Sequence, residues 1–260
     1  MAIRILVIDQ APRNETKKPP YQVEAIEEKL NSYASAGTTV EIGFPDDFEG
    51  ARVMEVLGAQ SRLNGLHHLM EAPGIVRKIF WAEQNGYDAV ISSNTFDPGV
   101  DGGRLAVGIP VIGLCRTAMH AALTLSDRVG ITVPLEPHVP YTWRILRSYG
   151  LDRFVSDIRP LGIYGADVAQ RQDEIFEVAV NLIRSLIEET RAEIIVPLGG
   201  ALIPYVVDPQ ELASSTGVQV LNTKAIGIRF AEMCVALGMT QSALTYPRAR
   251  LQYEDFVSRL

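Results

Sequence analysis

Short apolar runs alternate with longer amphipathic segments along the whole chain. The apolar runs are rich in β-branched residues and mostly continuous, as is typical of strands buried on both faces of a parallel sheet. They predict strands at Arg4–Ile8, Thr39–Phe44, Ala89–Ser92, Pro110–Leu114, Arg128–Val133, Asp157–Leu161, Glu193–Pro197 and Gln219–Leu221. The segments between them predict helices at Tyr21–Tyr33, Pro73–Asn85, Thr117–Leu125, Tyr141–Ser148, Asp173–Glu189 and Lys224–Leu237. This alternation indicates an α/β fold with right-handed crossovers.

A near-repeat divides the chain into two similar halves. The run Ala89–Ser92 and the run Glu193–Pro197 each end in small or polar residues, and each is followed by an insert and a second apolar run. We therefore predict two pseudo-symmetric lobes, each a four-stranded, mainly parallel sheet flanked by helices. Residues 1–117 plus 225–260 form the first lobe and residues 118–224 the second, with a ligand cleft between them. The last helix is assigned to the first lobe because it must cover an exposed sheet face.

The composition narrows the class of protein. Hydrophobic residues make up 47% and charged residues 21%, and the net charge of −7 argues against nucleic acid as the main partner, which would need a basic face. No apolar stretch reaches the roughly 18 residues that span a bilayer, and the first residues lack a signal-peptide pattern. Two cysteines, Cys115 and Cys234, make neither a disulfide framework nor a metal motif. We expect a cytoplasmic protein that does not bind membranes.

Several candidate ligand-binding residues follow the predicted strands. In parallel α/β folds, ligands lie beyond the carboxyl ends of the strands, where side-chain and backbone donors can bind a carboxylate. The candidates for substrate binding are Asp9, Ser93, Asn94, Thr95, Thr117, Gly199, Gly200 and Ala201. The polar run before Phe96 is equally typical of a helix cap, and the two interpretations are compatible. The polar segment Gln10–Pro20 is either a lid or an exposed loop.

Four residues are candidates for acid/base chemistry. Asp97 is a possible general base, although Asp before Pro also forms turns. Glu136 and His138 lie in the loop predicted after the fifth strand; a loop histidine can titrate near neutral pH or can simply be solvated. Cys115 ends a predicted strand and is either a relocated acid/base or a buried apolar residue.

The other titratable candidates predict no further chemistry. Cys234 has apolar neighbours on a helix and is expected in the core. His67 and His68 lie on a helical segment with no third ligand nearby in the sequence, so no metal site is expected.

Several motifs are similar to a known family. Phe96-Asp97-Pro98-Gly99-Val100-Asp101 is followed by the block Gly108–Ala122, and later by Arg128–Val133 and Ala192–Ala201. In order and spacing this resembles the hydantoin racemase branch of the aspartate/glutamate racemase superfamily, over nearly the whole chain. The resemblance implies a homo-oligomer that needs no cofactor or metal and acts on a small carboxylate or cyclic ureide.

The resemblance also implies an unusual site. Racemases of this family move the α-proton with two cysteines, and the positions that match them hold Asn94 and Gly200 here. We therefore expect an isomerase or racemase-like enzyme acting next to a carboxylate or carbonyl of a small acid or hydantoin-like substrate, without the cysteine pair. One alternative is a lyase, decarboxylase or hydrolase that uses an activated water near Gly200. Another is a non-catalytic protein that binds small carboxylates.

Overall fold

The computed structural model describes residues 2–9, 20–46, 56, 65–164, 171–200, 202–250 and 255. The chain divides into two compact units, each with its own sheet. The first unit comprises Met1–Val53, His67–Leu114 and Gly227–Leu260. The second comprises Met54–Leu66 and Cys115–Ile226. Residues 10–19 of the proposed lid lie outside the described part of the chain.

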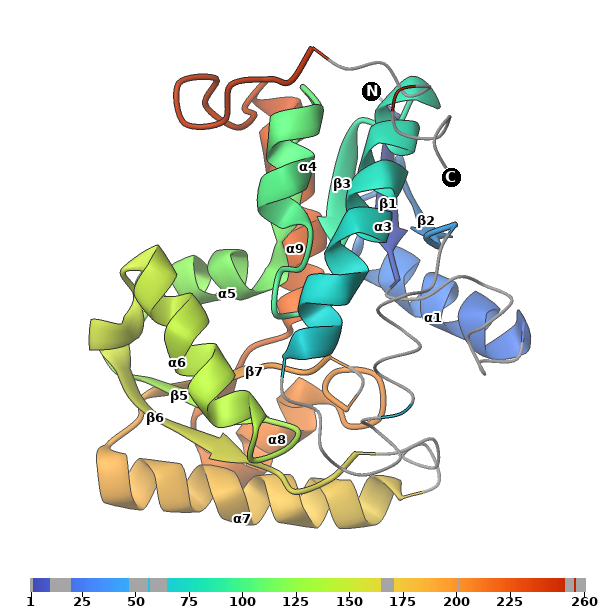
Figure 1. Ribbon diagram of the computed structural model, residues 1–260. Helices are drawn as coiled ribbons and strands as arrows, with labels where there is room; N and C mark the ends of the chain where they lie inside the picture. Colours follow the sequence, from blue (N-terminus) through green and yellow to red (C-terminus); the bar gives the residue numbers. More distant parts are fainter. Residues whose placement is uncertain are drawn as a thin grey trace. The chain divides into compact units, whose positions relative to one another are not determined.

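Figure 1 labels most of the helices and strands of the two units. In the first unit they are β1 (Ile3–Ile8), α1 (Pro20–Tyr33), β2 (Thr38–Gly43), α3 (Leu66–Gln84), β3 (Ala89–Ser92), α4 (Val100–Ala106) and β4 (Val111–Gly113). Those of the second unit are α5 (Leu114–Leu123), β5 (Val129–Val133), α6 (His138–Tyr149), η1 (Asp152–Phe154), β6 (Val155–Pro160), α7 (Gln172–Thr190), β7 (Ile194–Pro197), α8 (Pro209–Thr216) and β8 (Gln219–Val220). The last helix, α9 (Thr223–Ala236), begins in the second unit and continues in the first. Each predicted strand is confirmed to within two residues.

Both sheets are fully parallel and have equivalent strand orders. The first unit has the order β2-β1-β3-β4 and the second has β6-β5-β7-β8. Every recorded strand pair is parallel. In each unit, the second strand in the chain is an edge strand that pairs with one side of the first, and the third strand pairs with the other side of the first. The near-repeat of the sequence is therefore a repeat of topology. The predicted fold class is confirmed.

In the first unit, the side chains of neighbouring β3 residues pack on opposite faces of the sheet. Val90 belongs to the apolar cluster that α3 and α4 form with Ile75, Ile79 and Val100. On the other face, a Cβ added at Gly227 of α9 would lie 3.8 Å from a methyl group of Ile91. Successive side chains of a strand point to opposite faces, so a continuous apolar run is needed for a sheet covered on both sides.

In the second unit, α7 covers the sheet with one apolar stripe. Ile175, Ala179, Ile183 and Leu186 are fully buried and recur at helical spacing. They belong to one cluster with Ile195 of β7. Burial of such side chains contributes about 1.5–3 kcal/mol each to folding, so this stripe anchors α7.

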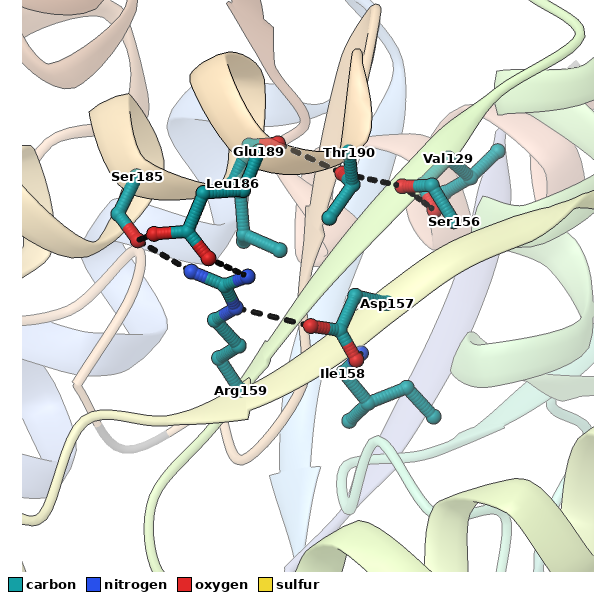
Figure 2. A network of polar contacts seen from close by, with 9 residues as sticks. All are labelled: Val129, Ser156, Asp157, Ile158, Arg159, Ser185, Leu186, Glu189 and Thr190. Carbon is teal, nitrogen blue, oxygen red and sulfur yellow. Dashed lines mark hydrogen bonds and ion pairs between the residues drawn. The ribbon is translucent and has the colours of Figure 1, made fainter.

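Polar contacts join the exposed rim of β6 to α7 (Figure 2). Arg159 donates from Nε to Asp157 at 2.9 Å and from Nη2 to Glu189 at 2.8 Å. Arg159 also contacts the Ser185 hydroxyl. Asp157 and Glu189 are partly to largely exposed, and an exposed ion pair contributes about 0–1 kcal/mol, so these contacts add little to the stability of the unit.

Two expectations about helices were wrong. Helix α3 begins at Leu66 rather than at Pro73, which is an interior residue of the helix. Its buried stripe passes through the proline, from His68 and Glu71 to Ile75 and Ile79, so packing outweighs the local cost of proline. The short helices α4 and α8 were not predicted, although Asp208 caps α8 by accepting from the Gln210 N–H at 2.7 Å. Their seven and eight residues are too few for a clear helical period.

The described helices include none with the length and apolar character needed to cross a bilayer.

Candidate functional site

A tight loop beyond β3 holds Asn94. The side-chain Oδ1 of Asn94 accepts a hydrogen bond from the Phe96 N–H at 3.0 Å, and the Asn94 carbonyl accepts from the Asp97 N–H at 3.1 Å. This is an Asx turn, in which the amide replaces a backbone acceptor. Helix α4 begins only after Gly99 and has no side-chain cap, so the expectation that this run caps a helix was wrong.

The other end of the Asn94 amide meets two side chains from α3. Asn94 Nδ2 lies 2.9 Å from His68 Nδ1 and donates to Glu71 Oε2 at 3.3 Å. His68 Nδ1 and Glu71 Oε2 are themselves 3.5 Å apart. All three side chains are buried. We call Asn94, His68 and Glu71 the amide cluster.

The amide cluster contains a carboxyl group with unusual electrostatics. Burial disfavours the charged form and raises the pKa of Glu71 well above its ordinary value of 4.5. The hydrogen bond from Asn94 acts in the opposite direction, and the Asp9 carboxylate raises the pKa further. Among the described residues, Glu71 Oε1 has no hydrogen-bond partner. The cluster thus holds a carboxyl group whose burial favours the protonated form, and whose Oε1 atom is not used in a hydrogen bond among the described residues.

Sequence reasoning missed His68 and Glu71 as site residues. The sequence shows His68 only as a helical histidine with no third metal ligand nearby, and nothing in it singles out Glu71. Their spacing of i and i+3 was the available signal, because such residues share one face of a helix. That face continues into the apolar stripe of α3, and it is this stripe that turns both polar residues inward.

The remaining candidates of the first unit lie near the same sheet edge. Asp9 directly follows β1 and is close enough to affect Glu71. Ser93 follows β3, with its N–H bonded to the Ile8 carbonyl at 2.8 Å, and Thr95 is fully buried. Asp97 is buried with φ 56°, and its carboxyl group packs on Gly113. Such a backbone conformation is uncommon outside glycine and marks a constrained turn.

His138 does not lie in an exposed loop as expected. It is the first residue of α6 and only 2% exposed, and its Nδ1 accepts from the Leu135 N–H at 3.3 Å. Pro140 lies in the first turn of α6, where a proline is tolerated. Burial lowers the pKa of His138 to about 4, although the contact with the Leu135 backbone opposes the shift. The side chain is therefore neutral at physiological pH.

We expect His138 to make stability depend on pH in mildly acidic solution. Between the folded pKa of about 4 and the ordinary value of 6.5, the unfolded chain binds a proton that the folded chain does not. Stability should therefore fall by about 3 kcal/mol as the pH drops through this range. Urea unfolding of the wild type and His138→Gln at pH values across the range measures this, and equal slopes in the two proteins would contradict it.

The remaining candidates and the second cysteine lie in different surroundings. Cys115 is fully buried inside α5 and does not end a strand, because β4 stops at Gly113 and α5 begins at once. Thr117 is buried on the same helix, whereas Glu136 is exposed before α6. Cys234 is buried as expected, and burial raises the pKa of its thiol.

Gly199 fixes the turn that follows β7. Its φ is +85°, and a Cβ at this position would lie 2.2 Å from Cγ of Pro134. The loops after β5 and β7 therefore meet at a point that only glycine fits. Gly200 follows and is half-buried, while Ala201 lies outside the described residues.

An open groove of about 430 Å³ lies elsewhere on the second unit. Its lining residues are Arg128, Ser156, Glu189, Thr190 and Arg191. Because Arg128 precedes β5 and Ser156 is near the start of β6, the groove lies at the amino-terminal ends of these strands, whereas Gly199 and Gly200 follow the carboxyl end of β7. It contains none of the residues predicted to bind substrate.

Comparison with known proteins identifies the family. The sequence model of Asp/Glu/Hydantoin racemase matches residues 23–231. The chain belongs to this family. It is 28% identical to a hydantoin racemase of Rhizobium meliloti over 189 residues, which are 72% of this chain and 77% of that protein.

Solved structures agree on the fold. An allantoin racemase from Pseudomonas fluorescens superposes with a TM-score of 0.80 at 23% identity, covering 96% of this chain and 98% of that one. An allantoin racemase from Klebsiella pneumoniae gives a TM-score of 0.76 at 22% identity, covering 96% and 95%. At such identities the likeness shows the fold alone.

Proposed function

We propose that this racemase-family protein is an isomerase that moves a proton at a carbon next to a carbonyl or carboxylate, with Glu71 in place of a thiol. The single observation that carries this is the amide cluster. By its resemblance to the family, the sequence puts Asn94 where the first catalytic cysteine belongs, and helix α3 brings a buried carboxyl group to that residue.

The chemistry of Glu71 suits this step. A general base works best when its pKa is close to the working pH, and burial shifts the pKa of Glu71 in that direction. When the substrate C–H bond breaks, its proton passes to Glu71 Oε1. The electron pair moves toward the carbonyl carbon and the carbonyl π pair moves to oxygen, giving an enolate. Return of a proton to the opposite face of this carbon completes the isomerisation, whereas return from Glu71 to the same face gives exchange with retention. Glu71 is a carboxylate again once it has lost the proton.

The substrate is proposed to be a small acid or a hydantoin-like ring. The hydantoin racemase of Rhizobium meliloti supports this class by sequence similarity. As further parts of the proposal, the enzyme works without a cofactor, in the cytoplasm, as a homo-oligomer. These follow from the composition and from the family resemblance.

Proton exchange in heavy water tests the function. We expect the purified protein to replace the α-proton of at least one compound in a panel of hydantoins, allantoin and small 2-substituted acids, followed by proton NMR and optical rotation. Exchange with loss of optical activity indicates racemisation, and exchange with retention indicates transfer on one face.

Two other results would overturn the proposal. Product formation without exchange would favour the lyase or hydrolase alternative, in which Asp97, Glu136 or His138 activates water. Tight binding of a small carboxylate without exchange or product would favour the non-catalytic alternative.

A further inference from the structure

Backbone contacts fix the orientation of the Asn94 amide. Oδ1 accepts from the Phe96 N–H at 3.0 Å, so a reversed amide would direct its NH₂ group against that donor. Nδ2 must therefore face His68 and Glu71. Since the carboxyl oxygen at 3.3 Å is an acceptor, one N–H of the amide is directed to it and the other to the imidazole.

This orientation decides which nitrogen of His68 holds a proton. An amide NH₂ group is only a donor, so the Nδ1 atom 2.9 Å away must be an acceptor. Neutral imidazole then has its proton on Nε2, and an imidazolium would place two donors face to face. The carboxyl oxygen of Glu71 is farther from Nδ1, at 3.5 Å, so the amide rather than the carboxylate sets the state of the ring.

Neighbouring groups hold the ring in place. The His68 ring lies 4.8 Å from the Phe96 ring, with 34° between their planes, and 3.8 Å from the His67 ring. The His68 side chain is almost completely buried. A buried, packed imidazole loses little orientational freedom when it binds a ligand. A group that stabilises a developing charge must be oriented in advance in this way.

We propose that Asn94 is a positioning residue that holds His68 as a neutral imidazole, and that the His68 Nε2–H donates to the carbonyl oxygen of the substrate while Glu71 takes the proton from the adjacent carbon. The inference rests on the proposed function. The Nε2 proton stays on His68 throughout, and its hydrogen bond strengthens as negative charge forms on the oxygen. A neutral donor polarises a carbonyl without becoming a second acid, so proton transfer is left to Glu71.

The proposal narrows the substrate class. The Glu71 carboxyl group lies 3.5 Å from His68 Nδ1, and the Asp9 carboxylate is close enough to act on Glu71, so an anionic group of the substrate is disfavoured at this point. The group that His68 binds is therefore a neutral carbonyl, as in a ketone, an amide or a cyclic ureide, rather than a carboxylate.

Nitrogen NMR of the full chain tests the state of His68 directly. In ¹⁵N-histidine-labelled protein, long-range proton–nitrogen spectra should show His68 with bare Nδ1 and protonated Nε2 between about pH 6 and 8. The His68→Phe protein identifies the signal by its loss. An imidazolium in this range or a proton on Nδ1 would overturn the proposal.

Variants of Asn94 test its positioning role. Asn94→Leu removes the donor and should lower kcat by about 100-fold with little change in KM, while the His68 signal becomes a mixture of tautomers. If the leucine variant does not fold, Asn94→Asp is used instead. Its carboxylate is an acceptor and should move the proton of the His68 ring to Nδ1. Asn85→Leu, which removes an exposed amide from the end of α3, is the matched control and should change neither.

The outcomes separate the inference from the function on which it rests. If the wild type exchanges protons but Asn94→Leu keeps both its rate and its tautomer, the positioning role is wrong and the isomerase stands. If no compound in the panel exchanges and none forms a product, the isomerase is wrong, and the NMR spectra still decide the state of His68.

Discussion

Glu71→Gln is expected to abolish proton exchange while leaving the protein folded. The amide keeps the shape of the side chain and can still accept from Asn94 Nδ2, but it cannot take a proton from carbon. Removing a general base typically lowers the rate by about 10²–10⁴-fold. The exchange rate in heavy water measures the loss, with Glu188→Gln, at an exposed glutamate of α7, as the matched control.

The same substitution should change how stability depends on pH. The folded pKa of Glu71 is raised, so above pH 4.5 the folded chain retains a proton that the unfolded chain loses. The stability of the wild type therefore falls as the pH rises toward the folded pKa. Glutamine removes this decrease, so Glu71→Gln should gain stability relative to the wild type as the pH rises. Urea unfolding at several pH values measures the difference.

These two readouts separate catalysis from structure. Loss of exchange together with the gain in stability at higher pH would show that the buried carboxyl group is needed for activity but lowers the stability of the folded chain. Such a trade-off is known for functional sites. Unchanged exchange in Glu71→Gln would remove Glu71 from the mechanism. An unchanged pH slope would show that the carboxyl group is not desolvated as described.

Gly199→Ala is expected to destabilise the second unit by about 2–4 kcal/mol. A left-handed backbone at φ +85° costs an alanine about 1–2 kcal/mol, and the Pro134 ring blocks the added methyl group. Neither Gly199 nor Pro134 can move without disturbing the ends of β7 and β5. Thermal or urea unfolding of the variant measures the loss.

Gly217→Ala is the matched control for the glycine prediction. Gly217 also has a positive φ, of +79°, at the C-cap of α8, but a Cβ there would meet nothing within 4 Å. The free energy of unfolding of Gly217→Ala should therefore be lower than that of the wild type by only the backbone cost of about 1–2 kcal/mol. Equal losses in the two variants would show that the contact with Pro134 does not determine the conformation of this loop.

The predicted fold followed from features that are local in the sequence. Continuous apolar runs give buried parallel strands, since each residue of β3 meets one of two covered faces. The near-repeat predicted the equivalent sheets of the two units. Errors arose where local signals conflict with packing. Pro73 suggested a helix start, but the buried face of α3 extends two turns before it.

Sequence by itself determined the strands, the duplicated topology and, by resemblance, the family and the replacement of its first cysteine by Asn94. Only the tertiary structure decided what Asn94 does. His68 and Glu71 precede it by 26 and 23 residues, and no local pattern relates positions so far apart. Their meeting depends on where α3 begins and on which of its faces the apolar stripe buries. The same burial raises the pKa of Glu71, so the property that suits it to chemistry exists only in the folded chain.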